Sequence, residues 1–477
     1  MAPLALAMMY IGGTEMVRKG RVTETKHITF NCKDIKALFE AIAEGERIKP
    51  FQVAKRTVFA RYGISGTRKD RIFTAIVYKF FKVYGILDKI VIWALKQNTL
   101  DKLCEELRIA LKLAAYLTQL DTIKDRRLIE AFENCIKKHI AEKCGTEQLK
   151  LFETAFEKMI TRYWKPSKEE LMELKYKMPY LLIKLFSKLV KDGKEFEDLI
   201  AALNSSPPLG FRINTLKTKS VEEVVRELQS AGVRVWVSKR VPFVIRYIGG
   251  LDYSRQKLLK EGIIVPQDET SALAAILLDP QPGEVIVDLC AAPGGKTTHV
   301  AELSRNLATV IALEIYPDRM ARLVELANKT STYISIYPII TDARYASKIL
   351  ARIKAHKVLI DPPCTSTGAL AKHPDARWRL TEEKLRELVE LQRTLLEEAH
   401  KLLRVGGRLL YTTCSILVEE NEDNIKWFLE KYPCYRIIPL RKPYEESPWL
   451  PGTMRAWPHK HNTTGFYYAL LEKVDEC

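Results

Sequence analysis

Residues 287–298, which read VDLCAAPGGKTT, constrain the fold of this chain more than any other stretch. An apolar run at 285–287 leads into the stretch, and a helix-like pattern begins near Lys296. The pattern predicts a buried parallel strand, a tight turn of small residues and the first turn of a helix. Small side chains let a ligand approach the backbone closely, and the free N–H groups of a helix start favour electron-rich ligand groups. The alternative is an ordinary strand–helix turn without a ligand.

Two nucleotide-binding loops do not match this stretch. A phosphate-binding P-loop needs a glycine five residues before the Gly-Lys-Thr sequence, and that position is Cys290. The dinucleotide fingerprint G-x-G-x-x-G is also missing. The stretch therefore predicts a different adenosyl cofactor, held in an α/β fold.

Length, composition and charge limit the number of domains and the kinds of partner that the chain can have. A chain of 477 residues predicts two to four domains, and a hydrophobic content of 47% is sufficient for globular cores. The formal net charge of +17 favours a polyanionic partner, although a surface rich in Lys and Arg for solubility or heat resistance is the alternative. No uncharged apolar run approaches the roughly 18–20 residues of a membrane span, so we expect no membrane association.

Nine cysteines are spread over the chain without a C-x-x-C pair. This spacing indicates neither a zinc site nor a disulfide framework, and we expect no metal. Unpaired cysteines are typical of a reducing compartment, so we expect a cytoplasmic protein. The positions are 32, 104, 135, 144, 290, 364, 414, 434 and 477.

Patterns of apolar residues divide the chain into five expected segments. They are an N-terminal extension (1–25), a helical domain (26–145), a helical connector (146–205), a small α+β module (206–262) and an α/β domain (263–477). Basic runs such as 68–71 in the helical domain have two interpretations, a solvated surface or a nucleic-acid contact.

The last segment alternates apolar runs with helical patterns, which predicts a doubly wound parallel sheet. One amphipathic helix is expected near 385–403 and should end at Gly406-Gly407. The alternating run 466–471 predicts a late strand, for which an antiparallel direction is one option. The earlier strands are expected at 284–290, 309–314, 334–340, 357–361 and 407–413.

Reactive side chains follow these predicted strands where each strand ends. Ligands bind outside the carboxyl ends of such strands, so Cys364 and Cys414 should meet over one crevice. Either cysteine alone is more simply a core filler. Two thiols at neighbouring strand ends favour a nucleophile with a helper thiol. Glu314, which ends the second strand, can accept both hydroxyls of a ribose.

Several motifs, taken together and in this order, resemble the RNA 5-cytosine methyltransferases of the Fmu/RsmB (Sun, NSUN) family. The stretch FRIN at 211–214 resembles the module that precedes the catalytic domain in that family. The helical domain resembles a NusB-like RNA-binding domain. The catalytic motifs are DLCAAPGGKTT at 288–298, DPPCTSTG at 361–368, HPD at 373–375 with Trp378, and TCS at 413–415 followed by EEN at 419–421.

The resemblance implies a Rossmann-like methyltransferase sheet with S-adenosylmethionine as methyl donor. It makes Cys414 the nucleophile and Cys364 the cysteine that assists turnover, with Asp361 and Lys296 also catalytic. DNA cytosine methyltransferases instead use the Pro-Cys cysteine, which would make Cys364 the attacking residue. The residues implied on the cofactor side are Cys290, Ala291, Ala292, Pro293, Gly294, Gly295, Lys296, Glu314, Arg319, Asp342 and Asp361.

These residues suit the chemistry that the resemblance implies. Carbon 5 of cytosine is a poor nucleophile, and a thiolate that adds to carbon 6 makes it reactive toward a sulfonium methyl group. A base must then remove the carbon-5 proton so that the thiolate can leave. Asp361 can hydrogen-bond the ring edge and Lys296 can polarise the base, while Lys372 and Trp378 can contact substrate phosphate and stack a base.

The resemblance favours ribosomal RNA as the substrate, with transfer RNA as the alternative, and we expect a monomer. A different class of function is a non-catalytic RNA-binding factor in ribosome assembly. A third alternative is an enzyme that acts on DNA or free bases. A binding factor has no use for two thiols in a crevice, so the two cysteines favour the enzyme.

Overall fold

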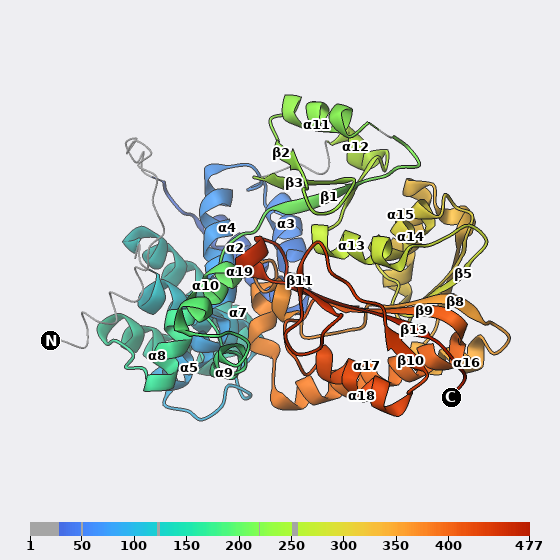
Figure 1. Cartoon of the computed structure of the whole chain (residues 1–477). Helices are drawn as coiled ribbons and strands as arrows, with labels where there is room; N and C mark the ends of the chain where they lie inside the picture. Colours follow the sequence, from blue (N-terminus) through green and yellow to red (C-terminus); the bar gives the residue numbers. More distant parts are fainter. Residues whose placement is uncertain (1–27, 49–50, 122–124, 219, 250–255) are drawn as a thin grey trace. The chain divides into compact units, whose positions relative to one another are not determined.

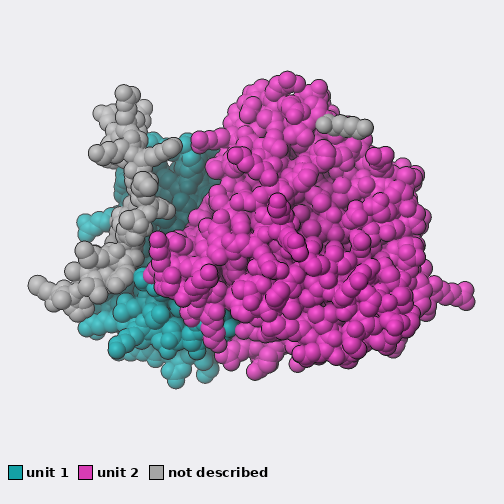
Figure 2. Space-filling model, viewed as in Figure 1, with its two compact units in different colours: residues 1–185, 373–379 teal, residues 186–372, 380–477 magenta. Residues whose placement is uncertain are grey.

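The computed structural model describes residues 28–48, 51–121, 125–218, 220–249 and 256–477 (Figure 1). The expected N-terminal extension at 1–25 lies outside these ranges. The chain divides into two compact units, shown in different colours in Figure 2. Unit 1 is Met1–Leu185 with His373–Arg379, and unit 2 is Phe186–Lys372 with Leu380–Cys477. The five-segment division remains a prediction.

The described part of unit 1 consists of helices and their connections, as the sequence predicts. The first N–H groups of a helix lack intrahelical partners, and capping boxes satisfy them at α2 (Asn31 with Asp34) and at α8 (Ser167 with Glu170). The long helix α7 is bent at Gly145, whose φ of 84° only glycine adopts readily. The helices are α2 (Cys32–Arg47), α3 (Phe51–Arg61), α4 (Arg68–Lys82), α5 (Tyr84–Leu95), α6 (Glu105–Ala115), η1 (Tyr116–Leu120), α7 (Arg126–Thr161), α8 (Lys168–Tyr176) and α9 (Tyr180–Ser187).

A segment from the C-terminal half of the sequence also belongs to unit 1. This is the short helix η5 (Pro374–Arg379). The indole N–H of Trp378 donates to the carbonyl of Lys82 at 3.0 Å, and a Cβ on Gly85 would clash with the Trp378 ring. The buried Arg377 donates to the carbonyl of Lys177 at 2.6 Å. The segment is therefore part of the packing of the helical unit.

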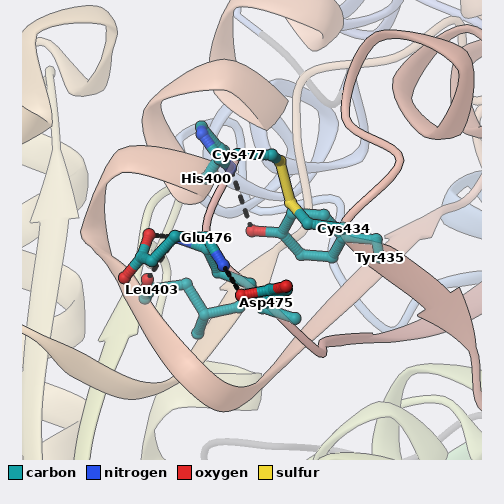
Figure 3. The surroundings of a disulfide bond; sticks show 8 residues. His400, Leu403, Cys434, Tyr435, Asp475, Glu476 and Cys477 are labelled. Carbon is teal, nitrogen blue, oxygen red and sulfur yellow. Dashed lines mark hydrogen bonds and ion pairs between the residues drawn. A yellow bond between two sulfur atoms is a disulfide. The ribbon is translucent and has the colours of Figure 1, made fainter.

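The cysteine pattern was misleading, and the expectation of no disulfides is wrong. Six of the nine cysteines form three disulfides, Cys32–Cys135 and Cys104–Cys144 in unit 1 and Cys434–Cys477 in unit 2. Figure 3 shows the last of these beside His400 and Tyr435. The partners are 103, 40 and 43 positions apart, so no local spacing indicates the pairing. Cysteine usage therefore does not indicate a reducing compartment.

Unit 2 contains a small antiparallel sheet whose strands occur in the order β2-β3-β1-β4. Its inner face is apolar, and the rings of Phe211 and Tyr247 stack with centroids 4.5 Å apart. The amphipathic α11 packs its buried Val224 and Leu228 into the same core. The elements around this sheet are α10 (Gly193–Asn204), β1 (Leu209–Ile213), α11 (Val221–Ser230), β2 (Arg234–Val237), β3 (Val244–Ile248), α12 (Lys257–Lys260) and β4 (Ile264–Pro266).

The main sheet of unit 2 has the order β11-β12-β13-β9-β8-β5-β6-β7, with β10 paired to β13. Strands β9, β8, β5, β6 and β7 are parallel, and the late strand β13 is antiparallel to β9. The strands are β5 (Val285–Asp288), β6 (Thr309–Glu314), β7 (Ile336–Ile340), β8 (Ala355–Ile360), β9 (Leu403–Thr413), β10 (Tyr435–Ile437), β11 (Glu445–Glu446), β12 (Met454–Ala456) and β13 (Phe466–Lys473).

Helices cover both faces of this sheet, so successive strand residues enter two different cores. Ile286 packs with residues of α13 to α15, whereas the next residue, Val287, packs with residues of α17 and α18. This is the doubly wound arrangement that the sequence predicts. The helices are α13 (Glu269–Leu278), α14 (Gly295–Leu303), α15 (Pro317–Thr330), η2 (Tyr333–Ser335), η3 (Ala343–Tyr345), α16 (Ala346–Ile349), η4 (Thr367–Ala369), α17 (Glu382–Leu402), α18 (Glu422–Lys431) and α19 (Pro458–His461).

The end of α17 differs from the prediction. The helix stops at Leu402 and β9 begins at Leu403, so Gly406-Gly407 lies within the strand and does not end the helix. Gly406 has a φ of 74°, and a Cβ on Gly407 would lie 2.8 Å from the carbonyl of Arg404. Both glycines are thus required by an irregularity of the strand. In the described residues no helix combines the length and hydropathy of a membrane span.

Candidate active site

The strand order reverses between β8 and β5, which places the loops after these strands at a topological switch point. The loop 289–296 follows β5, the segment 361–366 follows β8, and Cys414 follows β9. The carboxylates of Asp288, Asp361 and Glu314 all act on the Cys290 thiol and, together with its burial, which is the largest cause, raise its pKa. Cys290, Asp288, Glu314 and Asp361 therefore gather at this edge of the sheet.

Hydrogen bonds to a buried carboxylate hold the loop after β5. The carboxylate of Asp288 accepts from Thr297 Oγ1 at 2.8 Å and from the Cys290 backbone N–H at 3.3 Å. Burial raises the pKa of Asp288 to about 6. Gly294 has a φ of 102°, and a Cβ there would lie 3.0 Å from the Leu323 side chain. The turn can therefore approach α15 only with glycine at this position.

The surroundings of Gly295 fit a bound ligand that accepts hydrogen bonds. The side chain of Gln267 is 7% exposed, and its Nε2 has no hydrogen-bond partner among the described residues. A Cβ on Gly295 would lie 3.6 Å from this atom. Gln267 Oε1 accepts from Arg212 at 2.8 Å, which orients the amide. A buried donor without a partner is costly, so the amide beside the glycine loop suits an acceptor supplied by a ligand.

Lys296 and Asp361 form an ion pair across the switch point, with Nζ and Oδ2 2.5 Å apart. Burial opposes the charge on Lys296, but the charge and hydrogen bond of Asp361 outweigh it and raise the Lys296 pKa. The ammonium also lies 5.3 Å from the centroid of the Phe466 ring. The lysine therefore remains charged and directed at the crevice.

Cys364 and Cys414 meet as predicted, with their sulfur atoms 3.3 Å apart. The hydrogen bond from Cys364 lowers the pKa of Cys414, and Ser366 and Lys296 act in the same direction against burial and Asp361. The same hydrogen bond and burial raise the pKa of Cys364. Of the two, Cys414 is therefore the thiol that ionises more readily, and Cys364 can donate to it once it is charged.

A hydrogen-bonded framework joins the two segments that carry the cysteines. Glu420 is fully buried and accepts from the Thr365 backbone N–H and from Gln392 Nε2, each at 2.9 Å. Thr367 Oγ1 lies 2.9 Å from Ser415 Oγ, and the Gly368 N–H donates to the Cys414 carbonyl at 2.9 Å. The sequence motif at 419–421 includes Glu420 but predicts no role for it.

Two residues expected on the cofactor side are tied to the protein itself. Arg319 Nη1 lies 3.2 Å from Glu314 Oε2, and Nη2 donates to the Ala292 carbonyl at 2.5 Å. Arg319 therefore braces the loop and the strand end. Asp342, which follows β7, pairs with Arg344 at 2.6 Å, and this hydrogen bond lowers the pKa of Asp342.

Lys372 and Trp378, the predicted substrate contacts, each have a partner elsewhere in the chain. Lys372 forms an ion pair with Asp268 in unit 2. Trp378 is packed in unit 1, where its indole N–H donates to the Lys82 carbonyl and its ring lies against Gly85, so its role in stacking a base stays a prediction.

Comparison with known proteins gives two family matches. The model for the 16S rRNA methyltransferase RsmB/F matches residues 275–472. The model for the ferredoxin-like domain of RsmF/B-like methyltransferases matches residues 179–254. The matches cover the main sheet up to residue 472 and the strands β1 to β3 of the small antiparallel sheet.

Individual relatives agree with these matches. The ribosomal RNA small subunit methyltransferase B of Proteus mirabilis (strain HI4320) is 32% identical over 278 residues, which are 58% of this chain and 62% of that protein. The chain thus spans less than two thirds of the length of this relative. The crystal structure of PH0851 is 41% identical with a TM-score of 0.85, and covers 94% of this chain and 100% of its own. A methyltransferase homolog protein from Pyrococcus horikoshii is 26% identical with a TM-score of 0.56, over 65% of this chain and 100% of its own.

Proposed function

The chain belongs to the Fmu/RsmB family of RNA methyltransferases, and we propose that it methylates carbon 5 of cytosine through a covalent cysteine–cytosine intermediate. The observation that carries this proposal is the pair of sulfur atoms 3.3 Å apart at the switch point, one with a lowered and one with a raised pKa. A non-catalytic assembly factor has no need of a thiol with a lowered pKa beside a second thiol.

S-adenosylmethionine, when bound, supplies an electrophilic methyl group on a sulfonium. The residues that would hold it are the loop 290–296, Gln267 beside Gly295, and the carboxylate of Glu314 for a ribose. The positive end of α14 and the unsatisfied Gln267 donor suit the carboxylate of an amino acid moiety. Arg319 acts as the brace of this loop.

Cys414 attacks first in the proposed reaction. Its thiolate forms a bond to carbon 6 of cytosine, and the ring electrons move to make carbon 5 nucleophilic. The ammonium of Lys296 polarises the base, while the carboxylate of Asp361 accepts a hydrogen bond from the ring edge. Their mutual ion pair keeps both groups in place beside Cys414.

Cys364 then completes the reaction. Once Cys414 is bonded to carbon its charge is lost, and with it the interaction that most raises the pKa of Cys364. Cys364 can then release its proton to solvent, and its thiolate can take the proton from carbon 5. The electrons of that C–H bond restore the ring double bond, and the carbon–sulfur bond breaks to return the Cys414 thiolate.

We propose ribosomal RNA of the small subunit as the substrate, because the relatives named for this activity share the catalytic region. The test is bisulfite mapping of RNA from a strain that lacks this protein. One cytosine in small-subunit RNA should lose its protection and regain it when the protein is restored. Loss of protection in transfer RNA alone would make transfer RNA the substrate in place of ribosomal RNA. An unchanged map of both RNAs would count against cytosine-5 chemistry.

A further inference from the structure

Ser366 has an unusual backbone conformation between the two cysteines. Its φ is 55° and its ψ is 27°, in the left-handed region that side chains with a Cβ rarely adopt. Strained residues of this kind gather at functional sites, where the surrounding structure imposes the conformation. The strained backbone makes Ser366 a candidate functional residue.

Anchors on both sides impose this conformation. On one side, Glu420 accepts from the backbone N–H of Thr365. On the other side, Thr367 Oγ1 accepts from the Ile416 N–H at 3.0 Å and the Gly368 N–H donates to the Cys414 carbonyl at 2.9 Å. The residue between these anchors has little freedom to relax.

The consequence is that Ser366 faces both sulfur atoms. The Cys414 thiol donates to the Ser366 hydroxyl oxygen at 3.4 Å. Once Cys414 is ionised, the same hydroxyl can donate to the sulfur instead, and this interaction lowers the Cys414 pKa. Its backbone N–H is directed at the Cys364 sulfur, where it favours the thiolate form. The hydroxyl donates best to a charged Cys414, which has no proton of its own.

We propose that Ser366 is a further catalytic residue, whose hydroxyl donates to the Cys414 thiolate before attack and again as the thiolate leaves carbon 6. This inference rests on the proposed function. When sulfur bonds to carbon the hydroxyl loses its charged acceptor, and the hydrogen bond forms again as negative charge returns to sulfur. The bond thus stabilises both the resting thiolate and the departure of the leaving group.

The first test uses the full chain without RNA or cofactor. The rate of Cys414 alkylation by iodoacetamide is measured against pH in Ser366→Gly, with the modified cysteine identified by peptide mass spectrometry. Glycine accepts the left-handed conformation, so this variant removes the hydroxyl without harming the fold. The midpoint should rise by about one pH unit, since a hydrogen bond to a charged group is lost. The other charged or titratable groups that face Cys414, namely Cys364, Asp361 and Lys296, remain.

Ser331→Gly is the matched control. Ser331 also has a positive φ, of 61°, but it caps the C-terminal end of α15, away from the segments that carry the cysteines. The alkylation midpoint of this variant should equal that of the unsubstituted protein. An unshifted midpoint in Ser366→Gly would overturn the role of Ser366.

The second test measures turnover on RNA. Ser366→Gly should slow methyl transfer about tenfold near neutral pH and prolong the covalent protein–RNA adduct, because fewer molecules hold the thiolate and its departure is slower. A shifted midpoint with unchanged turnover and adduct lifetime would remove the catalytic role. Failure of the unsubstituted protein to methylate RNA would instead overturn the proposed function itself.

Discussion

The guanidinium of Arg212 on β1 forms a buried ion pair with Glu302 on α14, the helix that begins at the glycine loop. Both side chains are almost fully buried, and the Thr215 backbone N–H donates to the same carboxylate at 2.9 Å. Arg212 also donates to Thr298 and to Gln267. The small module therefore holds the helix from which the loop 290–296 is positioned.

Removal of one partner from this pair should destabilise unit 2 strongly. Glu302→Leu leaves the Arg212 charge buried without a counter-ion, and the expected cost is about 3–5 kcal/mol in the free energy of unfolding. Denaturant unfolding measures it. The double variant with Arg212→Met should be more stable than Glu302→Leu alone, because it carries no unpaired buried charge. If the losses of stability in the single variants Glu302→Leu and Arg212→Met add up to the loss in the double variant, the destabilisation does not come from the broken ion pair.

The two cysteines should give opposite results with RNA. Cys414→Ala should abolish methyl transfer and the covalent adduct, because no thiolate attacks carbon 6. Cys364→Ala should retain the adduct, since the base that allows release is missing. Denaturing gels with labelled RNA distinguish the two. An adduct lost in Cys364→Ala and retained in Cys414→Ala would reverse the assignment and match the DNA-type arrangement.

Asp288 should make stability depend on pH. Its pKa of about 6 in the folded protein exceeds the value of about 4 expected in the unfolded chain. The stability from the protonated carboxyl is therefore complete below pH 4 and is lost as pH rises through about 6. Asp288→Asn stays neutral, so its free energy of unfolding should gain about 3 kcal/mol relative to the unsubstituted protein as pH rises from about 4 to 7. Urea unfolding measures both free energies. If their difference is the same at every pH in this range, Asp288 does not cause the pH dependence.

Glu314 should contribute to the affinity for S-adenosylmethionine. Glu314→Gln keeps the size of the side chain but weakens acceptance of ribose hydroxyls, and the dissociation constant should rise about tenfold. Isothermal calorimetry on the intact protein measures it. Glu325→Gln is the control, because Glu325 is an exposed carboxylate on the neighbouring α15. Equal affinity in the two variants would contradict the ribose role.

The exposed basic face of α4 should contribute to RNA binding. Arg68, Arg71 and Lys79 are exposed and fall on one side of this helix. Their joint replacement by Gln should weaken binding and reduce the slope of log affinity against log salt by about 0.7–0.9 for each phosphate that the protein no longer neutralises. Filter binding at several salt concentrations measures the slope. Replacement of Arg322, Lys426 and Arg436 in unit 2 controls for net charge, and equal slopes in both triple variants would argue against a specific role of α4.

These substitutions are a sharper test than deletion of residues 1–145. Trp378 and Arg377 pack within unit 1, against Lys82, Gly85 and Lys177. A deletion would remove part of that packing along with any RNA contacts. Point changes on an exposed face leave the packing intact, so their effect on RNA affinity can be assigned to charge.

Local pattern was sufficient for much of the fold and for the meeting of the cysteines. Runs of apolar residues separated by helical patterns specify parallel strands, and the chain direction then places every strand end on one edge. Cys364 and Cys414 follow two such ends, so their proximity could be predicted from the sequence. The same argument located Asp361, Glu314 and the glycine loop.

Only the tertiary structure decided which distant groups pair with one another. The disulfide Cys32–Cys135, the Arg212–Glu302 pair and the packing of Trp378 in unit 1 each join segments that share no local pattern. The strained turn at Ser366 also depends on anchors from the segment between β9 and α18. Periodicity reports which face of an element is buried, but not which residue lies opposite, because that depends on the close packing of the whole chain.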